Sequence, residues 1–296
     1  MRTLRTNLEI KLQFNQIEQL KLLTEKLESI GLKSYPYGGS VRDLLIGEII
    51  GGDIDIMTVY EDIQNSDIIN LFKSNIFDLC NKINAKYKDY PEKNILIYGI
   101  PNIPIFDIKY PISSIENRLS RADISINGIA FDIKSGSLID PFLGKPDLEV
   151  QQLRIHSPEY IVTYPPNFPR IFRIACKQNL TLNRETKDFF KFYAHCISMG
   201  DKSSKQTTLI EFLRFLSTLQ IKSYLHEFAQ LGFIDYLFPE LTPTKQLLDS
   251  NRTRFDLNIT LATSVDELND PPTARTKLDE DIGLRITLRG LVRFAL

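Results

Sequence analysis

The first regular pattern of apolar residues along the chain is helical. Leu20, Leu23, Leu27 and Ile30 recur every three or four positions, and a glycine follows directly after the last of them. This spacing places the four side chains on one face of a helix. The sequence therefore predicts an amphipathic helix that ends near Ser29.

Short apolar runs rich in β-branched residues follow between Tyr35 and about Asp140. They cover residues 54–59, 95–100 and 103–108, and glycine, proline and asparagine separate them. Runs of this length between turn-forming residues are typical of strands. We therefore expect a mixed α/β domain here.

Beyond Pro169 the strand signals fade and helical spacing replaces them. Helical patterns cover residues 171–178, 187–199, 209–219 and 224–231. The polar stretch 200–208 is expected to connect two of these helices, and residues 270–276, with a pair of prolines, resemble a late linker. The second half of the chain is thus predicted to be α-helical.

Composition narrows the class of protein only a little. The 296 residues, with 18 Phe and 12 Tyr, can fill more than one core, and the formal net charge of −1 favours no particular partner. Three cysteines and three histidines are scattered without the spacing of a zinc site or a disulfide framework. No apolar run is as long as the roughly 18 residues of a membrane span, so we expect a cytoplasmic protein without membrane contact.

The strongest chemical signal is a pair of glycines, Gly38 and Gly39, fourteen to seventeen residues before the acidic pair Asp53 and Asp55. Glycines let the backbone approach a ligand, and residues 40–43 have the pattern of a capping box that opens a short helix. Such a helix start is a natural phosphate site.

Asp53 and Asp55 lie two residues apart on a predicted strand, so both carboxylates emerge on one face while Ile54 and Ile56 enter the core. Two close carboxylates repel each other unless a cation lies between them, and oxygen ligands favour Mg²⁺. A capped surface helix beside an edge strand with solvated acids is the alternative. The direct succession of the two features favours a functional site.

Residues 38–47 and 53–56 resemble the first motif of the polymerase β-like nucleotidyltransferases, in the branch of tRNA nucleotidyltransferases and bacterial poly(A) polymerases. Further similarity lies at residues 121–130, 138–148, 170–173 and 237–241. The resemblance implies an α+β fold, with a small mixed β-sheet head and an all-α neck and body. We expect an N-terminal helix over residues 1–33, a catalytic head over 34–150, a neck over 151–241 and a body of unknown role over 242–296.

The resemblance also implies roles for individual residues in adding nucleotides to the 3′ end of an RNA. Asp53 and Asp55 would bind Mg²⁺, and Asp107, on a neighbouring predicted strand, is a candidate third carboxylate or a plain edge-strand acid. The residues expected to hold the nucleoside triphosphate, ATP or CTP, are Gly38, Gly39, Ser40, Arg42, Asp43, Arg121, Asp123 and Asn127. In the family a second arginine stands where this chain has Ala122, so one contact to the triphosphate or the sugar is missing.

The predicted neck departs further from the family pattern. Relatives carry Glu-Asp three residues before the motif arginine, where this chain has Pro166 and Asn167 ahead of Arg170. The family's aspartate and arginine read the incoming base, and Arg173 lies on the same helical face. An amide donates as well as accepts, whereas a carboxylate only accepts. We therefore expect discrimination among the four bases to be looser here.

An RNA-binding surface is expected along the neck. Lys177, Arg184 and Lys187 follow the motif arginines, and aromatic residues at 172, 189, 190, 192 and 193 stand between them. Such residues can follow an RNA backbone and stack on bases, although aromatics at helical spacing more often form a core. A tRNA is the favoured acceptor. The alternatives are a poly(A) polymerase, an enzyme with another acceptor or nucleotide, and an inactive RNA-binding paralogue.

Overall fold

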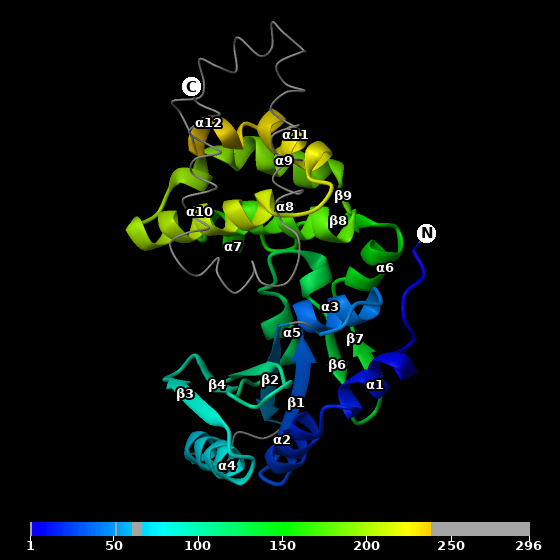
Figure 1. The fold of residues 1–296 in the computed structure, drawn as a ribbon, viewed down its shortest axis with the longest axis vertical. Coiled ribbons are helices and arrows are strands. Elements are labelled where there is room, and N and C mark those ends of the chain that lie inside the picture. Colours follow the sequence, from blue (N-terminus) through cyan, green and yellow to red (C-terminus); the bar gives the residue numbers. More distant parts are fainter. Residues whose placement is uncertain (1, 51, 61–66, 238–296) are drawn as a thin grey trace, which may run out of the picture. The chain divides into compact units, whose positions relative to one another are not determined.

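The computed structural model describes residues 2–50, 52–60 and 67–237 (Figure 1). The chain divides into two compact units, with the division between Ser157 and Pro158. The predicted late linker at 270–276, most of the motif at 237–241 and the body at 242–296 lie outside the described residues. No helix in the described ranges is both long and apolar enough to cross a membrane.

The first unit is built on a seven-stranded mixed sheet with the strand order β3-β4-β5-β2-β1-β6-β7. Its strands are β1 (Leu32–Tyr37), β2 (Asp53–Tyr60), β3 (Lys86–Tyr90), β4 (Asn94–Tyr98), β5 (Ile105–Lys109), β6 (Ala130–Asp132) and β7 (Ser137–Ile139). Neighbouring strands in this sheet run antiparallel, apart from β2 and β5, which run parallel. The three strands expected at 54–59, 95–100 and 103–108 correspond to β2, β4 and β5.

Helices and a short 3₁₀ turn complete the first unit. They are α1 (Asn7–Asn15), α2 (Glu18–Glu28), α3 (Gly39–Leu45), α4 (Ile68–Lys82), α5 (Ile115–Leu119), η1 (Ser125–Asn127) and α6 (Gly144–Glu149), with a short strand β8 (Gln152–Leu153). The helix expected to end near Ser29 is α2, which buries Leu20, Leu23 and Leu27 and has Ser29 as its C-cap.

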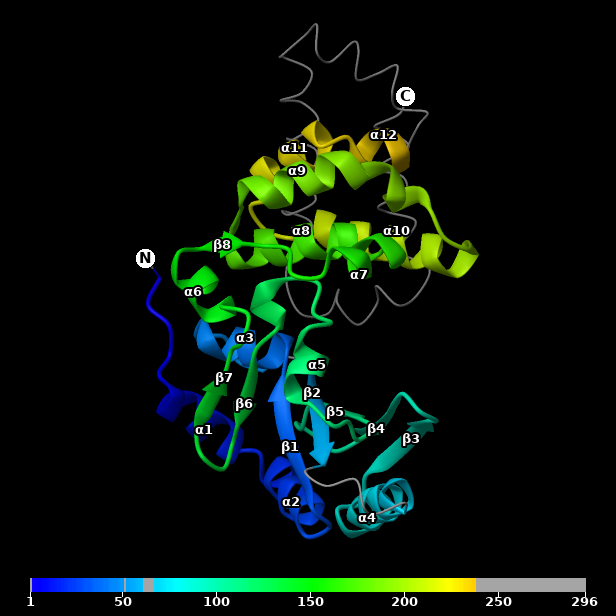
Figure 2. The same ribbon diagram turned by 180° about the vertical axis from the view of Figure 1, so that it is seen from behind.

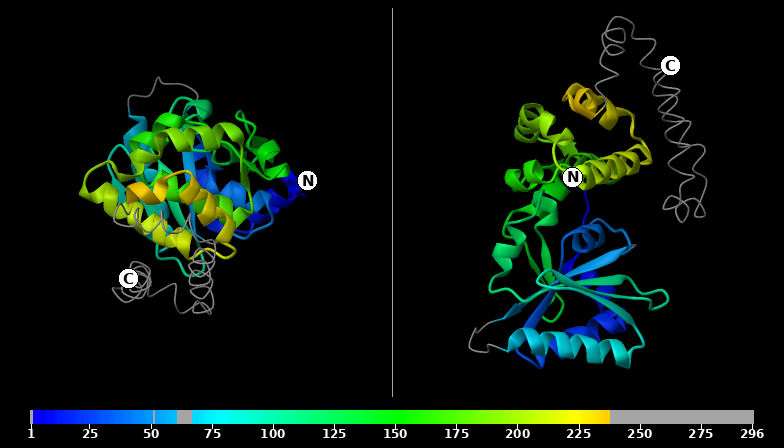
Figure 3. Two further views of the ribbon diagram at one scale, coloured as in Figure 1. Left: turned by 90° about the horizontal axis from the view of Figure 1, so that it is seen from above. Right: turned by 90° about the vertical axis from the view of Figure 1, so that its left-hand side faces the viewer.

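Two helices cover one face of the sheet, and the acidic residues Asp53 and Asp55 lie on the other face. Helices α2 and α4 lie side by side against the covered face (Figure 3). Ile54 and Ile56 are fully buried there. On the other face Met57 and Val59 of β2 pack with Tyr35 and Leu119, and α5 lies against β2 there (Figure 2).

The second unit is helical, as expected. It contains α7 (Pro158–Thr163), α8 (Asn167–Gln178), α9 (Arg184–Tyr193), η2 (Ala194–Ser198), α10 (Lys202–Leu216), α11 (Lys222–Gln230) and α12 (Phe233–Leu237), with a two-residue strand β9 (Thr181–Leu182). The expectation of a connection over residues 200–208 was wrong. Asp201 caps the amide of Ser204, and α10 already begins at Lys202.

Phenylalanine rings form the core of the second unit. The ring of Phe172 contacts the rings of Phe190, Phe215, Phe228 and Phe233, with centroids 5.0–5.9 Å apart. All five rings are fully buried. The hypothesis that aromatics between the basic residues stack on RNA is therefore wrong for Phe172 and Phe190, which are core residues.

Candidate active site

Three aspartates lie on the same face of the sheet, on two neighbouring strands. Asp53 and Asp55 lie two residues apart on β2, and β5 pairs with β2 in the register that sets Asp107 beside Asp55. Side chains two apart on a strand share a face, and so do partners in register. The sequence prediction that both acids of β2 emerge opposite Ile54 and Ile56 agrees with this arrangement.

Lys109 lies between two of these carboxylates. Its Nζ is 3.1 Å from Oδ1 of Asp55 and 2.6 Å from Oδ2 of Asp107. Asn94 of β4 donates from Nδ2 to the other oxygen of Asp107 at 2.6 Å. Within the described ranges no three carboxylate, thiol or imidazole side chains are grouped so as to hold a metal ion. An ammonium group thus supplies the positive charge between Asp55 and Asp107.

Burial changes the electrostatics of this cluster. It raises the pKa of Asp55, the nearby Lys109 ammonium lowers it, and the carboxylates of Asp107 and Asp53 raise it again, so that the net change is upward. The phenol of Tyr37 also has a raised pKa, first through burial and then through the carboxylate of Asp55. A second positive charge at the cluster would favour the ionised form of Asp55.

The glycine pair lies directly next to the aspartates, because Tyr37, the last residue of β1, pairs with Asp55. Gly38 has φ +72° and ψ −133°, a conformation that suits glycine, and its amide donates to the carbonyl oxygen of Ile129. A Cβ placed on Gly38 would lie 4.0 Å from Oδ2 of Asp55. The main chain here therefore comes close to the carboxylates.

The predicted capping box at residues 40–43 was wrong. Helix α3 begins at Gly39, its N-cap is Gly38, and no side chain caps it. The Ser40 hydroxyl instead donates to the carbonyl oxygen of Tyr37 at 3.3 Å. The sharp backbone turn at Gly38 moves the helix start two residues earlier than a serine cap would place it.

Arg42 connects helix α3, which follows the glycine pair, with the segment at residues 121–130. Its Nε and Nη2 donate to Oδ1 of Asp43 at 2.9 and 2.7 Å, and its Nη1 donates to Oδ1 of Asn127 at 2.6 Å. Asn127 in turn donates from Nδ2 to Oδ1 of Asp123 at 2.8 Å. Oδ2 of Asp123 is buried without a hydrogen-bond partner in the part of the chain that is described. Arg121 lies close by in sequence and is exposed.

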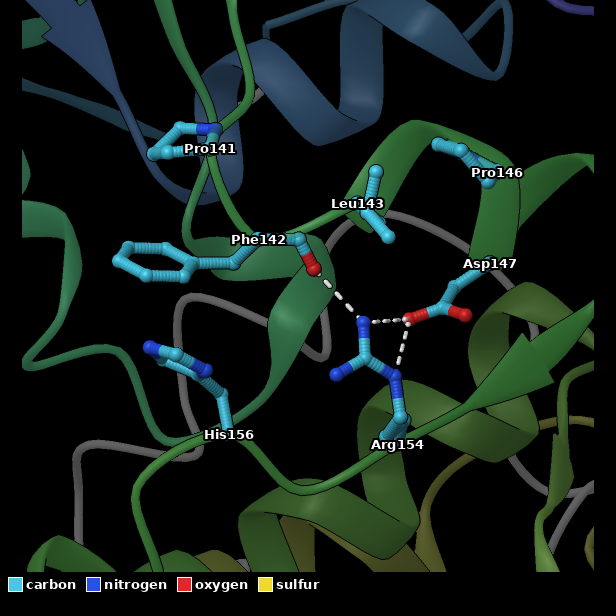
Figure 4. A pocket seen from close by; sticks show the side chains of 7 residues that line it. All are labelled: Pro141, Phe142, Leu143, Pro146, Asp147, Arg154 and His156. Atoms are coloured by element: carbon cyan, nitrogen blue, oxygen red, sulfur yellow. Dashed lines mark hydrogen bonds and ion pairs between the residues drawn. The ribbon is translucent and has the colours of Figure 1, made fainter.

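The segment after this network forms an open pocket of about 440 Å³, lined by Pro141, Phe142, Leu143, Pro146, Asp147, Arg154 and His156 (Figure 4). The Arg154 guanidinium donates to the carbonyl oxygen of Phe142 and to Oδ2 of Asp147, at 2.6 and 3.0–3.1 Å. The same Asp147 oxygen accepts a short hydrogen bond from the Ser125 hydroxyl. These bonds hold residues 141–147, which include the start of α6, against η1, the turn that contains Asn127.

The predicted base-reading residues lie on one helix of the second unit, α8. Asn167 is buried at the start of α8 and donates from Nδ2 to the carbonyl oxygen of Tyr160 at 2.9 Å. Arg170 is exposed. Arg173 is held by Glu211 of α10 at 3.1 Å, and burial lowers the pKa of its guanidinium.

The basic residues expected to contact RNA differ in their surroundings. Lys177 is exposed near the end of α8. Arg184 is almost fully exposed and lies 3.8 Å from Asp188, a loose surface pair. Lys187 forms an ion pair with Glu227 of α11 at 2.5 Å. Arg184 and Lys177 thus present more accessible charge than Lys187.

The sequence did not predict that three further residues lie beside Asp55 and Asp107. These are Tyr37, Asn94 and Lys109. A signal for Lys109 was present, because a residue two positions after Asp107 on a strand faces the same way. Tyr37 directly precedes the glycine pair. The contact of Asn94 depends on how β4 pairs with β5, which the sequence pattern does not specify.

Comparison with known proteins finds relatives of this chain. Residues 34–154 match the family described as the poly A polymerase head domain. A CCA-adding enzyme of Streptococcus uberis is 26% identical over 251 residues, 82% of this chain and 60% of the relative. A CCA-adding enzyme of Blochmanniella floridana is 31% identical over 134 residues, 44% of this chain and 31% of the relative. The chain thus spans about 60% of the length of the Streptococcus relative.

Solved structures share the fold. A Thermotoga maritima CCA-adding enzyme complexed with tRNA superimposes with a TM-score of 0.68 at 20% identity, covering 88% of this chain and 66% of that one. A CCA-adding enzyme with CTP gives a TM-score of 0.67 at 20% identity, covering 85% of this chain and 62% of the other. At 20% identity this similarity establishes the fold alone, a mixed-sheet unit followed along the chain by a helical unit.

Proposed function

We propose that this chain, whose residues 34–154 match the poly A polymerase head domain, is a member of the family of CCA-adding enzymes and poly(A) polymerases, and that it is a divalent-metal-dependent nucleotidyltransferase that extends the 3′ end of an RNA. The observation that carries the proposal is the placement of Asp53, Asp55 and Asp107 on adjacent strands beside the glycine turn. That combination offers oxygen ligands and an approachable backbone in one place.

The donor set suits a hard divalent cation. Asp53, Asp55 and Asp107 offer only carboxylate oxygens, which Mg²⁺ prefers, and Asp55 and Asp107 already share one cationic group. A bound ion would neutralise triphosphate charge and activate the RNA 3′-hydroxyl. The protein's own part is to hold its carboxylates at fixed places on a rigid sheet, with Ile54 and Ile56 anchored in the core behind them.

The nucleotide would lie along the glycine turn and the segment 121–127. Gly38 and Gly39 let the triphosphate approach the main chain, and exposed Arg121 can reach it. Oδ2 of Asp123, which is buried and has no hydrogen-bond partner among the described residues, would accept from a ribose hydroxyl. Asp43 accepts from Arg42, and Arg42 in turn donates to Asn127, so the part of this pair is to fix the turn and Asn127 in place.

Base choice would rest on Asn167 and Arg170. The carbonyl oxygen of Tyr160 takes up one donor of the Asn167 amide and fixes the amide with its own oxygen turned away from that bond. An amide held in this way offers its oxygen as an acceptor, as a carboxylate does, although it keeps a second N–H that can donate. We therefore expect stronger preference for C and A, whose amino groups donate, than the sequence alone predicted.

A tRNA is the acceptor that the relatives favour, because the curated relatives described above are CCA-adding enzymes and one of the solved structures holds a tRNA. The chain's exposed cations Arg170, Lys177 and Arg184 would contact phosphates by charge, so binding should weaken as salt rises.

The direct test incubates purified protein with Mg²⁺, each nucleoside triphosphate separately, and tRNA that lacks its 3′-terminal nucleotides. We expect labelled product with CTP and ATP, and none with Asp53→Asn or Asp55→Asn. Asp78→Asn serves as the matched control, because Asp78 is an exposed carboxylate on α4, on the opposite face of the sheet. Transfer by either active-site variant at the wild-type rate would refute the metal assignment. RNA binding without transfer by the wild type would identify an inactive paralogue.

A further inference from the structure

Lys109 is the one cationic side chain in contact with the aspartate cluster among the described residues. Its side chain is 19% exposed, and its Nζ touches Asp55 on β2 and Asp107 on its own strand, β5. The backbone beneath it is anchored, because the fully buried Thr58 donates from its hydroxyl to the Lys109 carbonyl oxygen at 2.8 Å. Only the flexible four-carbon side chain can move.

The charges of the cluster leave little room for both Lys109 and a full set of metal ions. Three carboxylates carry a charge of −3, and the Lys109 ammonium reduces it to −2. A single divalent ion balances that remainder. A cation placed within reach of both Asp55 and Asp107 would meet the ammonium at close range, where two positive charges repel strongly. The same two carboxylate oxygens cannot bond to Nζ and also serve as undisturbed metal ligands.

We propose that Lys109 is an internal counter-cation that competes with divalent metal for Asp55 and Asp107. In metal-free protein its ammonium holds the two carboxylates together, and metal that binds to both of them displaces it. Lys109 therefore weakens metal binding before the nucleotide arrives. The inference rests on the proposed function only for the identity of the competing ion, and the geometry of Lys109 stands without it.

The test measures metal binding alone, without RNA or nucleotide. Metal-free full-length protein is titrated with Mn²⁺ by calorimetry, for the wild type, Lys109→Met and Lys109→Arg. Methionine keeps an unbranched side chain and removes the charge. Lys86→Met is the matched control, because Lys86 is an exposed lysine on β3, two strands away from β5.

Lys109→Met should bind Mn²⁺ at least about tenfold more tightly than the wild type, since a repelling unit charge has gone. Lys86→Met should bind as the wild type does, and Lys109→Arg should stay within a few fold of it. Equal or weaker Mn²⁺ binding by Lys109→Met would overturn the proposal.

A second measurement uses the wild-type chain and so does not depend on how a variant folds. Brief acetylation of lysines with acetic anhydride, followed by mass spectrometry, compares metal-free and Mn²⁺-saturated protein. Labelling of Lys109 should rise with Mn²⁺ as its ammonium leaves the carboxylates, while that of Lys86 stays constant. Unchanged or reduced labelling of Lys109 would contradict displacement.

The two proposals can fail separately. If Lys109→Met binds Mn²⁺ more tightly but no form of the chain transfers nucleotides, the competition stands and the proposed function falls. If the wild type transfers nucleotides while Lys109→Met binds Mn²⁺ no more tightly, the function stands and the role of Lys109 falls.

Discussion

The conformation of Gly38 predicts a sharp difference between two neighbouring glycines. Gly38 has φ +72° and ψ −133°, whereas Gly39 is the first residue of helix α3. A Cβ on Gly38 would meet nothing nearer than the Asn127 carbonyl oxygen at 3.9 Å and Asp55 Oδ2 at 4.0 Å. The cost of Gly38→Ala is therefore conformational rather than steric. Backbone of this kind costs a non-glycine residue about 1–3 kcal/mol.

Gly39→Ala is the matched control. Its Cβ would lie 3.5 Å from Nη2 of Arg42, an ordinary contact, and alanine suits a helix. We expect Gly38→Ala to lower the melting temperature by roughly 3–10 °C and Gly39→Ala to leave it nearly unchanged. Both added methyl groups stand where a triphosphate would approach, so both variants should lose transfer activity.

Urea denaturation and thermal melts of the two variants and the wild type measure the stability difference, and the transfer assay measures the function. Equal stability of the two variants would mean that the turn at Gly38 relaxes without cost. Full activity of Gly39→Ala would mean that the triphosphate does not approach the main chain at that position.

Three further outcomes are expected. Burial raises the pKa of Asp55 in the folded protein, so the ionised carboxylate lowers the stability of the fold at neutral pH. Asp55→Asn should therefore melt at a higher temperature than the wild type at pH 7 in metal-free buffer. Below the ordinary pKa of about 3.9 the two proteins should melt at the same temperature, which thermal melts at both pH values would measure. Asn167→Asp removes the donor to the Tyr160 carbonyl oxygen and leaves two buried acceptors facing each other, so urea denaturation should register a loss of about 1–3 kcal/mol. Phe172→Ala should cost about 3–5 kcal/mol in the same assay, whereas an unchanged midpoint would contradict its place in the core.

Much of the fold was accessible from the sequence, because local patterns carry it. The first four residues of the strand of Asp53 and Asp55 alternate between polar and apolar, and the helix of Leu20, Leu23 and Leu27 has a clear apolar stripe. Helix α4 was overlooked, although Phe72, Ile76 and Leu79 recur at helical spacing on its buried face. Its residues lie between short runs rich in β-branched residues, and these runs led to the prediction of strands without a helix between them.

The contacts of the site were harder to predict, because they join residues far apart in the chain. Asp107 and Lys109 come next to Asp55 only through the parallel pairing of β5 with β2. Strand order and register depend on how whole elements pack, and the sequence of a five-residue strand such as β5 contains little information about its neighbours. The capping box failed for a local reason, since a backbone turn at Gly38 replaced the serine cap.

In the first unit, the residue that departs from the family pattern, Ala122, lies outside the hydrogen-bond network that supports the candidate site. Arg42 and Asn127, 85 residues apart, are joined at 2.6 Å, and Asn127 continues the network to Asp123. Each of these residues is present, and each lies buried where a change would leave polar groups unpaired. Ala122, in place of a family arginine, is only partly buried and contributes no polar side chain to this network. By the family resemblance, the loss of that arginine would remove a contact to the nucleotide without changing the hydrogen bonds of this network. If the chain transfers nucleotides as proposed, we expect a raised KM for the triphosphate with kcat largely retained, relative to an enzyme that carries the arginine.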